Sequence, residues 1–198
     1  MSAQDYWEDF YSGDRARWSG NANASLVEEV AELAPGTALD LGCGQGADAI
    51  WLASQGWTVT GADISQKALD VAARAAADAG VTVAWERHDL AESLPAGPFD
   101  LVTSSFLHSD VELPRARILR AAAEAVAPGG TLLVVGHAPS PEHHHHADLP
   151  GPDEVVAELA LPDAEWELER SELRERQHAF RDEAPKTRID TVVRFRRR

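Results

Sequence analysis

The 198-residue chain is 44% hydrophobic and 26% charged, a composition typical of a globular protein long enough to bury one well-formed core. Its formal net charge is -15 and its pI about 4.8, so most of its surface repels polyanions and we expect no nucleic-acid partner. Cys43 is the only cysteine, which excludes an intrachain disulfide and fits a reducing compartment. The N-terminus lacks the cationic start and apolar core of a signal peptide, and no run of about 18 apolar residues occurs. We therefore expect a cytoplasmic protein with no membrane partner.

The first 35 residues predict a helical segment. Ser25 is placed to cap a helix that ends at the Pro35–Gly36 pair. The aromatic residues of the preceding stretch fall at helical spacing, namely Tyr6, Trp7, Phe10 and Tyr11.

A regular alternation of strands and helices follows. Apolar runs predict strands over 37–41, 57–63, 81–89, 99–107 and 131–137, and periodic stretches predict helices over 46–56, 65–80 and 113–130. Strands that alternate with helices indicate right-handed crossovers and a parallel sheet with helices on both faces.

The pattern changes after His137. Residues 138–152 predict a loop, 152–160 a short helix, and 165–180 and 187–197 two long strands that form an antiparallel pair at the sheet edge. The predicted fold is α/β, a doubly wound, mostly parallel seven-stranded sheet of Rossmann-like type. We expect one domain over 1–198, with a helical cap (1–35), a cofactor-binding core (36–137) and a region of loop, short helix and edge strands (138–198).

The first strand ends in the stretch "LDLGCGQG", which predicts a ligand-binding turn. Gly42, Gly44 and Gly46 form the pattern G-x-G-x-G, whereas a dinucleotide fingerprint is G-x-G-x-x-G. A dinucleotide places its pyrophosphate in this turn, and the carboxylate of Asp40 would repel it. The pattern favours a ligand with a cationic group, such as S-adenosylmethionine, which carries an ammonium and a sulfonium and no phosphate.

Two further acids end predicted strands. Asp63 lies about 20 residues after the glycines, where doubly wound folds place an acid on ribose hydroxyls. Asp89 ends the third strand, where a carboxylate accepts a hydrogen bond from the exocyclic amine of adenine. Three acids in series therefore suit ammonium, ribose and adenine in turn.

Five stretches in order, "LDLGCGQG", "VTGADIS", "ERHDL", "PFDLVTSSFLH" and "APGGTLLVVGH", resemble the motifs of class I S-adenosylmethionine-dependent methyltransferases. The resemblance covers roughly residues 20 to 140 and is greatest to the small bacterial group that includes tellurite-resistance and thiopurine methyltransferase-like proteins. It implies methyl transfer from S-adenosylmethionine to a small-molecule acceptor, with S-adenosylhomocysteine as product and no required metal. It leaves open the acceptor atom (O, N, S, Se or Te) and whether the protein is a monomer or a homodimer.

The resemblance also implies a set of cofactor-binding residues. They are Asp40, Gly42, Cys43 and Gly44 for the methionine part, Asp63 for the ribose, Ile64, Asp89 and Leu90 for the adenine, Ser104, Ser105 and Phe106 beneath the methyl donor, and Trp18 as a cover. Cys43 has no basic neighbour to activate its thiol, so we interpret it as a small residue beside the ligand.

A neutral hydroxyl acceptor would need a general base. His108 and His137 follow the fourth and fifth strands and are the candidate catalytic residues, with Tyr6 and Tyr11 as further candidates. The alternative is that both histidines are ordinary loop residues. The acceptor pocket is expected between the N-terminal aromatic helix and the loops 106–115 and 137–152.

A run of four histidines, His143 to His146, lies inside the predicted loop. Imidazole suits Zn or Ni, so the run is an adventitious or real metal site, a solvated loop, or a lid over the acceptor. It also motivates a second hypothesis, a non-catalytic S-adenosylmethionine-binding or metal-handling protein on the same fold. A third hypothesis is a nucleotide-dependent oxidoreductase.

Overall fold

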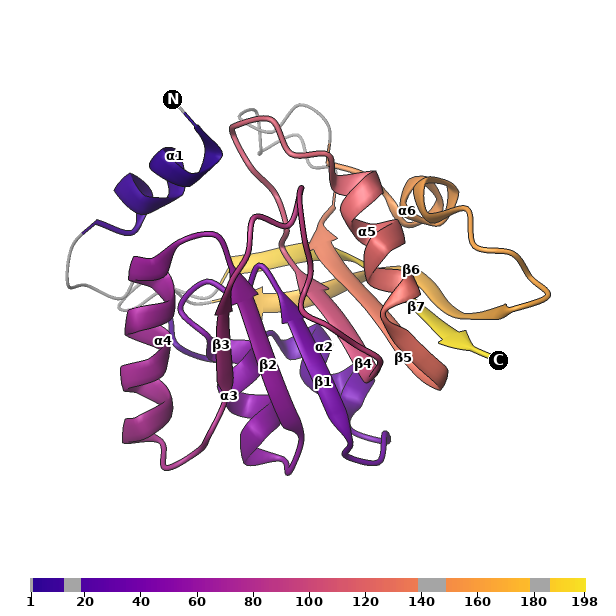
Figure 1. Ribbon diagram of the computed structural model, residues 1–198. Coiled ribbons are helices and arrows are strands. Elements are labelled where there is room, and N and C mark those ends of the chain that lie inside the picture. The colour runs from indigo at the N-terminus through magenta and orange to yellow at the C-terminus, as the bar shows by residue number, and fades with distance from the viewer. Residues whose placement is uncertain (1, 13–18, 139–148, 179–185) are drawn as a thin grey trace.

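The computed structural model describes residues 2–12, 19–138, 149–178 and 186–198. Within them a seven-stranded sheet has the strand order β3-β2-β1-β4-β5-β7-β6 (Figure 1). The strands are β1 (Thr37–Leu41), β2 (Thr58–Asp63), β3 (Ala84–Arg87), β4 (Phe99–Ser105), β5 (Val126–His137), β6 (Trp166–His178) and β7 (Lys186–Arg197).

Strands β1 to β5 are parallel, whereas β7 is antiparallel to both β5 and β6. The strand order reverses between β1 and β4. In folds of this type, ligands bind at the carboxyl ends of the two strands that flank such a reversal. The predicted doubly wound sheet with an antiparallel C-terminal pair is confirmed.

The helices are α1 (Ala3–Phe10), α2 (Ala24–Val30), α3 (Ala47–Ser54), α4 (Gln66–Asp78), α5 (Arg115–Glu124) and α6 (Pro152–Leu159). Leu26 of α2 and Leu52 of α3 belong to one buried apolar cluster with the sheet, and Leu119 of α5 and Leu159 of α6 belong to another. Helices therefore cover both faces of the sheet, with α2 and α3 on one side and α5 and α6 on the other (Figure 1).

Several predicted boundaries were wrong. The helix predicted over 113–130 ends at Glu124, and residues 126–130 belong to β5 rather than to a helix. The N-cap of α2 is Asn23, whose side chain accepts a hydrogen bond from the Ser25 N–H, so Ser25 lies inside the helix and is buried. Strand β3 spans four residues rather than the nine predicted, because only this part pairs with β2. By contrast, Ser65 caps α4 as expected, with its hydroxyl accepting from the Ala68 N–H.

The amino edge of the sheet is tied together by Asp100. Its carboxylate accepts hydrogen bonds from the N–H and the hydroxyl of Thr37, at 2.8 and 2.9 Å. The bond from the Thr37 N–H is the main reason why the pKa of Asp100 lies below its ordinary value.

Helix α1 docks at the carboxyl edge. The Glu8 carboxylate accepts from the Gln66 N–H at 2.9 Å and from the Ser65 hydroxyl at 3.1 Å, so α1 is attached to the N-terminus of α4. The Tyr6 hydroxyl donates to Asp110, which follows β4, at 2.8 Å. Figure 1 shows α1 above the end of α4.

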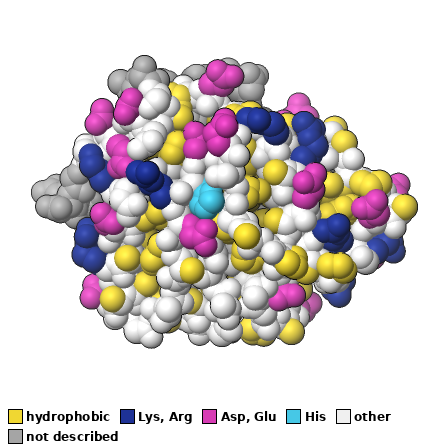
Figure 2. All heavy atoms as spheres, in the orientation of Figure 1, with side chains coloured by type: hydrophobic (Ala, Val, Ile, Leu, Met, Phe, Trp, Pro, Cys, Tyr) yellow, Lys and Arg dark blue, Asp and Glu magenta, His cyan; other side chains and the backbone are white. Residues whose placement is uncertain are grey.

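Charge on the surface is mixed. On the face seen in Figure 2, Lys and Arg side chains stand in separate small groups among acidic and uncharged ones. Among the described residues, none of the helices is both long and apolar enough to cross a membrane.

Candidate functional site

Three acids gather where β1 and β2 end and α3 begins. Asp40 and Asp63 are buried, Asp48 is partly buried, and no Lys or Arg in the described part of the chain forms an ion pair with any of them. Burial raises the pKa of Asp40 well above its ordinary value, and the nearby carboxylates of Asp48 and Asp63 raise it further. The charged forms of these acids are therefore disfavoured in the ligand-free protein, and a cationic ligand would stabilise them.

Asp48 was not among the predicted site residues. It stands in the first turn of α3, where its carboxylate accepts from the Asn23 N–H at 2.7 Å. Burial raises its pKa as well. The helix dipole stabilises an acid in the first helical turn. This local role already explains an Asp at position 48, so the sequence did not indicate a binding role for it.

Buried hydrogen-bonding atoms without partners lie on β1 and β4. Among the described residues, Asp40 Oδ2 and Thr103 Oγ1, which lie side by side in register, are buried and have no hydrogen-bond partner. Ser104 Oγ is also buried and unpartnered, but its side chain projects from the opposite face of the sheet. Burying an acceptor without a donor costs about 1–3 kcal/mol. A ligand that carries N–H donors and positive charge fits Asp40 and Thr103.

The glycine loop does not offer its N–H groups to an anion. The Gly42 and Cys43 N–H groups both donate to the Ala62 carbonyl, at 2.8 and 3.0 Å, and the Gly44 N–H donates to Asp63 Oδ2 at 2.8 Å. A phosphate site needs several such donors directed at the ligand. These three N–H groups are used within the protein, which supports the argument against a dinucleotide.

The glycines instead allow neighbouring side chains to pack closely against the backbone of the loop. Gly42 has a φ of +68°, and a Cβ there would lie 2.8 Å from a methyl carbon of Leu107. A Cβ at Gly46 would lie 2.6 Å from the ring of Trp85. The loop is therefore packed tightly between the segment after β4 and the ring on β3.

Cys43 is not set up as a nucleophile. Burial raises the pKa of its thiol, and the carboxylates of Asp63 and Asp40 raise it further. It therefore stays a neutral thiol near neutral pH, as the sequence predicted.

The second acid, Asp63, is already engaged by the backbone. Its Oδ2 accepts from Gly44 and its Oδ1 from the Ser65 N–H at 2.9 Å. Burial raises its pKa, and these N–H groups lower it. A carboxylate accepts about four hydrogen bonds, so Asp63 keeps capacity for ligand hydroxyls while it holds the loop in place.

The predicted adenine residues lie at the same edge. Ile64 is half-buried, Leu90 packs against the apolar core beneath α5, and Asp89 is exposed. Asp89 Oδ1 accepts from the Ala91 N–H at 3.0 Å, so this acid shapes the turn after β3. Its predicted contact with adenine stays a prediction.

The end of β4 carries an unusual backbone conformation. Phe106 has a φ of +55°, a left-handed conformation that an aromatic residue rarely adopts. Its ring stacks on His137 with 4.3 Å between ring centroids. Ser104 is buried and Ser105 is half-buried just before this turn.

The structure brings the two candidate catalytic histidines together. The rings of His108 and His137 stack with 5.7 Å between centroids, and the His137 backbone N–H donates to His108 Nε2 at 3.2 Å. Both lie at the carboxyl edge of the sheet, as expected.

A partner of His137 was missed. Asp190 on β7 lies directly opposite His137 on β5, with 4.0 Å between its Oδ1 and His137 Nδ1. No sequence signal could have found it, because the register of β5 against β7 is not readable from either strand alone.

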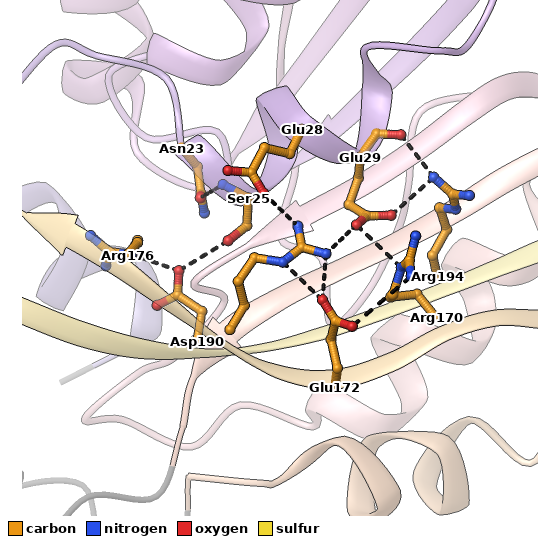
Figure 3. A network of polar contacts seen from close by, with 10 residues as sticks. Asn23, Ser25, Glu28, Glu29, Arg170, Glu172, Arg176, Asp190 and Arg194 are labelled. Carbon is orange, nitrogen blue, oxygen red and sulfur yellow. Dashed lines mark hydrogen bonds and ion pairs between the residues drawn. The ribbon is translucent and has the colours of Figure 1, made fainter.

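A second group of polar residues covers the sheet between α2 and the β6–β7 hairpin (Figure 3). Glu29, which is 3% exposed, forms ion pairs with Arg170, Arg174 and Arg194, and Glu172 joins Arg174. We call Glu29 and its three arginines the α2–hairpin network.

Two predictions fall outside the described residues. These are Trp18 as a cover over the cofactor and His143, His144, His145 and His146 as a metal site. Within the ranges that the structure describes, no group of three or more His, Cys, Asp or Glu side chains is arranged to hold a metal ion.

Comparison with known proteins places these features in a family context. Residues 38–130 match the model of a family described as a methyltransferase domain. The chain is similar to the ubiquinone biosynthesis O-methyltransferase of Caulobacter sp. (strain K31), with 39% identity over 99 residues, which is 48% of this chain and 38% of that protein. The match thus spans less than half of that relative's length.

Solved structures resemble the whole fold. One described as "Conversion of a Disulfide Bond into a Thioacetal Group during Echinomycin Biosynthesis" has a TM-score of 0.76 and 26% identity, covering 98% of this chain and 92% of that one. The magnesium protoporphyrin IX methyltransferase (ChlM) of Synechocystis PCC 6803, solved with bound SAH, has a TM-score of 0.65 and 18% identity, covering 98% and 94%. The second likeness is one of fold.

Proposed function

We propose that this chain is a class I S-adenosylmethionine-dependent methyltransferase that transfers a methyl group from S-adenosylmethionine to a small-molecule acceptor. The observation that carries the proposal is the acid cluster of Asp40, Asp48 and Asp63. Its acids are buried or partly buried, none of them pairs with a cationic side chain among the described residues, and Asp40 presents an unpartnered oxygen. A ligand with an ammonium group and a sulfonium supplies the missing charge.

Different residues would bind the different parts of S-adenosylmethionine. Asp40 would accept from the ammonium group of the methionine part, and the Thr103 hydroxyl lies buried beside it on the neighbouring strand. Asp63 would hold the ribose hydroxyls while it fixes the loop through Gly44. Ile64, Asp89 and Leu90 line the expected adenine side.

When bound, S-adenosylmethionine supplies an activated methyl group, whose bond to sulfur breaks with the electron pair left on sulfur as the acceptor atom attacks. The chain then has to align the acceptor and exclude water. Aromatic side chains of α1, joined to the segment after β4 through Tyr6 and Asp110, supply apolar surface for this purpose. The O-methyltransferase name of the curated relative favours a hydroxyl acceptor.

Calorimetric titration of the full chain with S-adenosylmethionine, S-adenosylhomocysteine and NAD tests the ligand assignment. We expect binding of the first two and none of NAD. Methyl transfer is then measured on catechol, thiols and amines by following S-adenosylhomocysteine. Binding of NAD alone would replace the proposal with the oxidoreductase hypothesis.

The histidine run keeps a second candidate in view, a cofactor-binding or metal-handling protein without transfer activity. It predicts that S-adenosylmethionine binds but that no acceptor in the panel is methylated. Deletion of residues 143–146 separates the two hypotheses, because a metal-handling role would lose Zn²⁺ or Ni²⁺ binding while cofactor affinity stays unchanged.

A further inference from the structure

Asp190 is held so that one of its oxygens faces His137. Its side chain is 0% exposed. Oδ2 accepts from Arg176 Nε at 2.6 Å and from the Ser25 hydroxyl at 3.4 Å, so α2 and β6 fix the carboxylate from two sides (Figure 3). The other oxygen, Oδ1, is the one that lies 4.0 Å from His137 Nδ1.

This pair shares a face of the sheet with the acid cluster. Asp40 lies beside Thr103 in register, and Ser105, two residues later, lies beside Val135. His137 is two residues beyond Val135. Because side chains alternate along strands, Asp40 and His137 project from the same side of the sheet, at its carboxyl edge.

His108 accepts a hydrogen bond at one ring nitrogen. Its Nε2 accepts the His137 backbone N–H, so its proton resides on Nδ1. A protonated His108 would direct an N–H at another N–H. The space is tight, since a Cβ at Gly136 would lie 3.2 Å from His108 Nε2.

Within the part of the chain that the structure describes, two strands bring charged groups close to His137. Asp190 contributes a buried carboxylate from β7, and Arg176 contributes a guanidinium from β6 that pairs with Asp190 and lies 5.2 Å from the Phe106 ring. At 4.0 Å the Asp190 carboxylate is too far from Nδ1 for a hydrogen bond, but its charge favours the tautomer with the proton on Nδ1 and leaves Nε2 as the basic nitrogen.

We propose that Asp190 is a positioning residue for His137, and that His137 Nε2 accepts the proton that the acceptor loses on methylation. The inference rests on the proposed methyl transfer. The acceptor's X–H bond breaks, its electron pair forms the bond to the methyl carbon, the proton moves to Nε2, and the imidazolium later returns it to solvent. The acceptor class is therefore a hydroxyl or thiol that is protonated at neutral pH.

An NMR titration tests the pairing without any acceptor or cofactor. The imidazole resonances of ¹³C-histidine-labelled protein are followed against pH in the parent and in Asp190→Asn, with His137→Gln to assign the signal. We expect the pKa of His137 to fall by about one unit when the carboxylate is lost. Asp100→Asn, an acid-to-amide change at the opposite edge of the sheet, should leave it unchanged. An unchanged His137 titration in Asp190→Asn overturns the proposal.

Kinetics test the proton transfer with two thiol probes. Benzyl mercaptan is protonated at neutral pH and needs a base, whereas 4-nitrothiophenol is ionised and needs none. Asp190→Asn should lower kcat for benzyl mercaptan by about 10–100-fold and leave kcat for 4-nitrothiophenol within about twofold. Adding Asp190→Asn to His137→Gln should cause no further loss, because Asp190 acts through His137. Equal losses on both probes, or losses that multiply in the double variant, contradict the proposal.

These experiments distinguish a failure of this inference from a failure of the proposed methyl transfer. If the parent binds no S-adenosylhomocysteine, the proposed function fails and the NMR result still decides whether Asp190 controls His137. If Asp190→Asn melts at a much lower temperature, His137→Gln is used alone, since it leaves the Asp190–Arg176 pair intact. A uniform loss on both probes in that variant overturns the base assignment.

Discussion

Glu29 and the acid cluster around Asp40 lie on the same side of the sheet, but only Glu29 is paired with basic side chains among the described residues. Glu29 on α2 is surrounded by arginines of the β6–β7 hairpin (Figure 3). Asp40 stands beside two further carboxylates, and its pKa is raised well above its ordinary value by burial and then by those neighbours. One acid has its counter-charge supplied by the chain, whereas the other has none among the described residues.

The difference separates a structural site from a ligand site. A buried charge is tolerated only when it is paired. The α2–hairpin network satisfies this rule within the protein and therefore holds α2 to the hairpin. The acid cluster violates it, and a cationic ligand would restore it, which is the physical basis for placing the methionine end of the cofactor there.

The largest expected effect is on the stability of the paired acid. Glu29→Ala leaves three guanidinium groups without their shared carboxylate and should lower the free energy of unfolding by about 3–5 kcal/mol, measured by urea unfolding. Glu28→Ala is the control, because Glu28 is 66% exposed and pairs with Arg174 only at 3.3 Å. A similar loss in both variants would mean that the network is no more than surface charge.

On the unpaired side, the main effect is on affinity. Asp63→Ala removes the acceptor of the Gly44 and Ser65 N–H groups as well as the expected ribose contact. We expect it to weaken S-adenosylmethionine binding by about 1–3 kcal/mol, measured by calorimetry. Asp70→Ala on the exposed face of α4 should bind as the parent does. Parent-like affinity in Asp63→Ala would remove Asp63 from the site.

A change of opposite sign is expected for the stability of the ligand-free protein. Asp40→Asn removes a charge that burial and two neighbouring carboxylates disfavour, so the variant should unfold at higher urea concentration than the parent at neutral pH. Because the folded-state pKa of Asp40 lies above its ordinary value of 3.8, the parent loses stability as the pH rises through that window. The advantage of the variant should therefore shrink as the pH falls toward 3.8. An advantage that grows on acidification contradicts the raised pKa.

The smallest effect concerns the docking of α1. Glu8→Gln weakens the charge-assisted bonds to the N-terminus of α4 and should lower the free energy of unfolding by about 0.3–1 kcal/mol. Hydrogen exchange in residues 3–10 should rise with little change elsewhere. Asp9→Asn, one residue along the same helix, is the control, and equal exchange in both variants would show that Glu8 does not hold α1.

The sequence was informative where a local pattern carries the structure. Alternating strands and helices predicted the sheet and its antiparallel end, and Asp40 stood out because it is an acid two residues before the first glycine. Contacts between residues far apart in the chain could not be predicted from the sequence. Glu29 meets Arg174 across 145 positions, and Asp190 meets His137 only through the register of β5 and β7. Asp48 was missed because its position in a helical first turn already had a local explanation.

Two independent observations on the glycine loop argue against a bound phosphate. The spacing and Asp40 argued against a phosphate through charge. The structure adds that the N–H groups of Gly42, Cys43 and Gly44 are already used by the Ala62 carbonyl and Asp63, so these three donors are not directed at an anion.

The central claim is that Asp40 is the unpaired acid that receives a cationic ligand group. Calorimetry with S-adenosylhomocysteine, which has the amino-acid end, and 5′-methylthioadenosine, which lacks it, tests this claim in the parent and in Asp40→Asn. Loss of a charge-assisted hydrogen bond should weaken S-adenosylhomocysteine binding by about 1.5–3 kcal/mol and leave 5′-methylthioadenosine binding unchanged. Equal weakening of both ligands, or parent-like affinity for S-adenosylhomocysteine, would contradict the account.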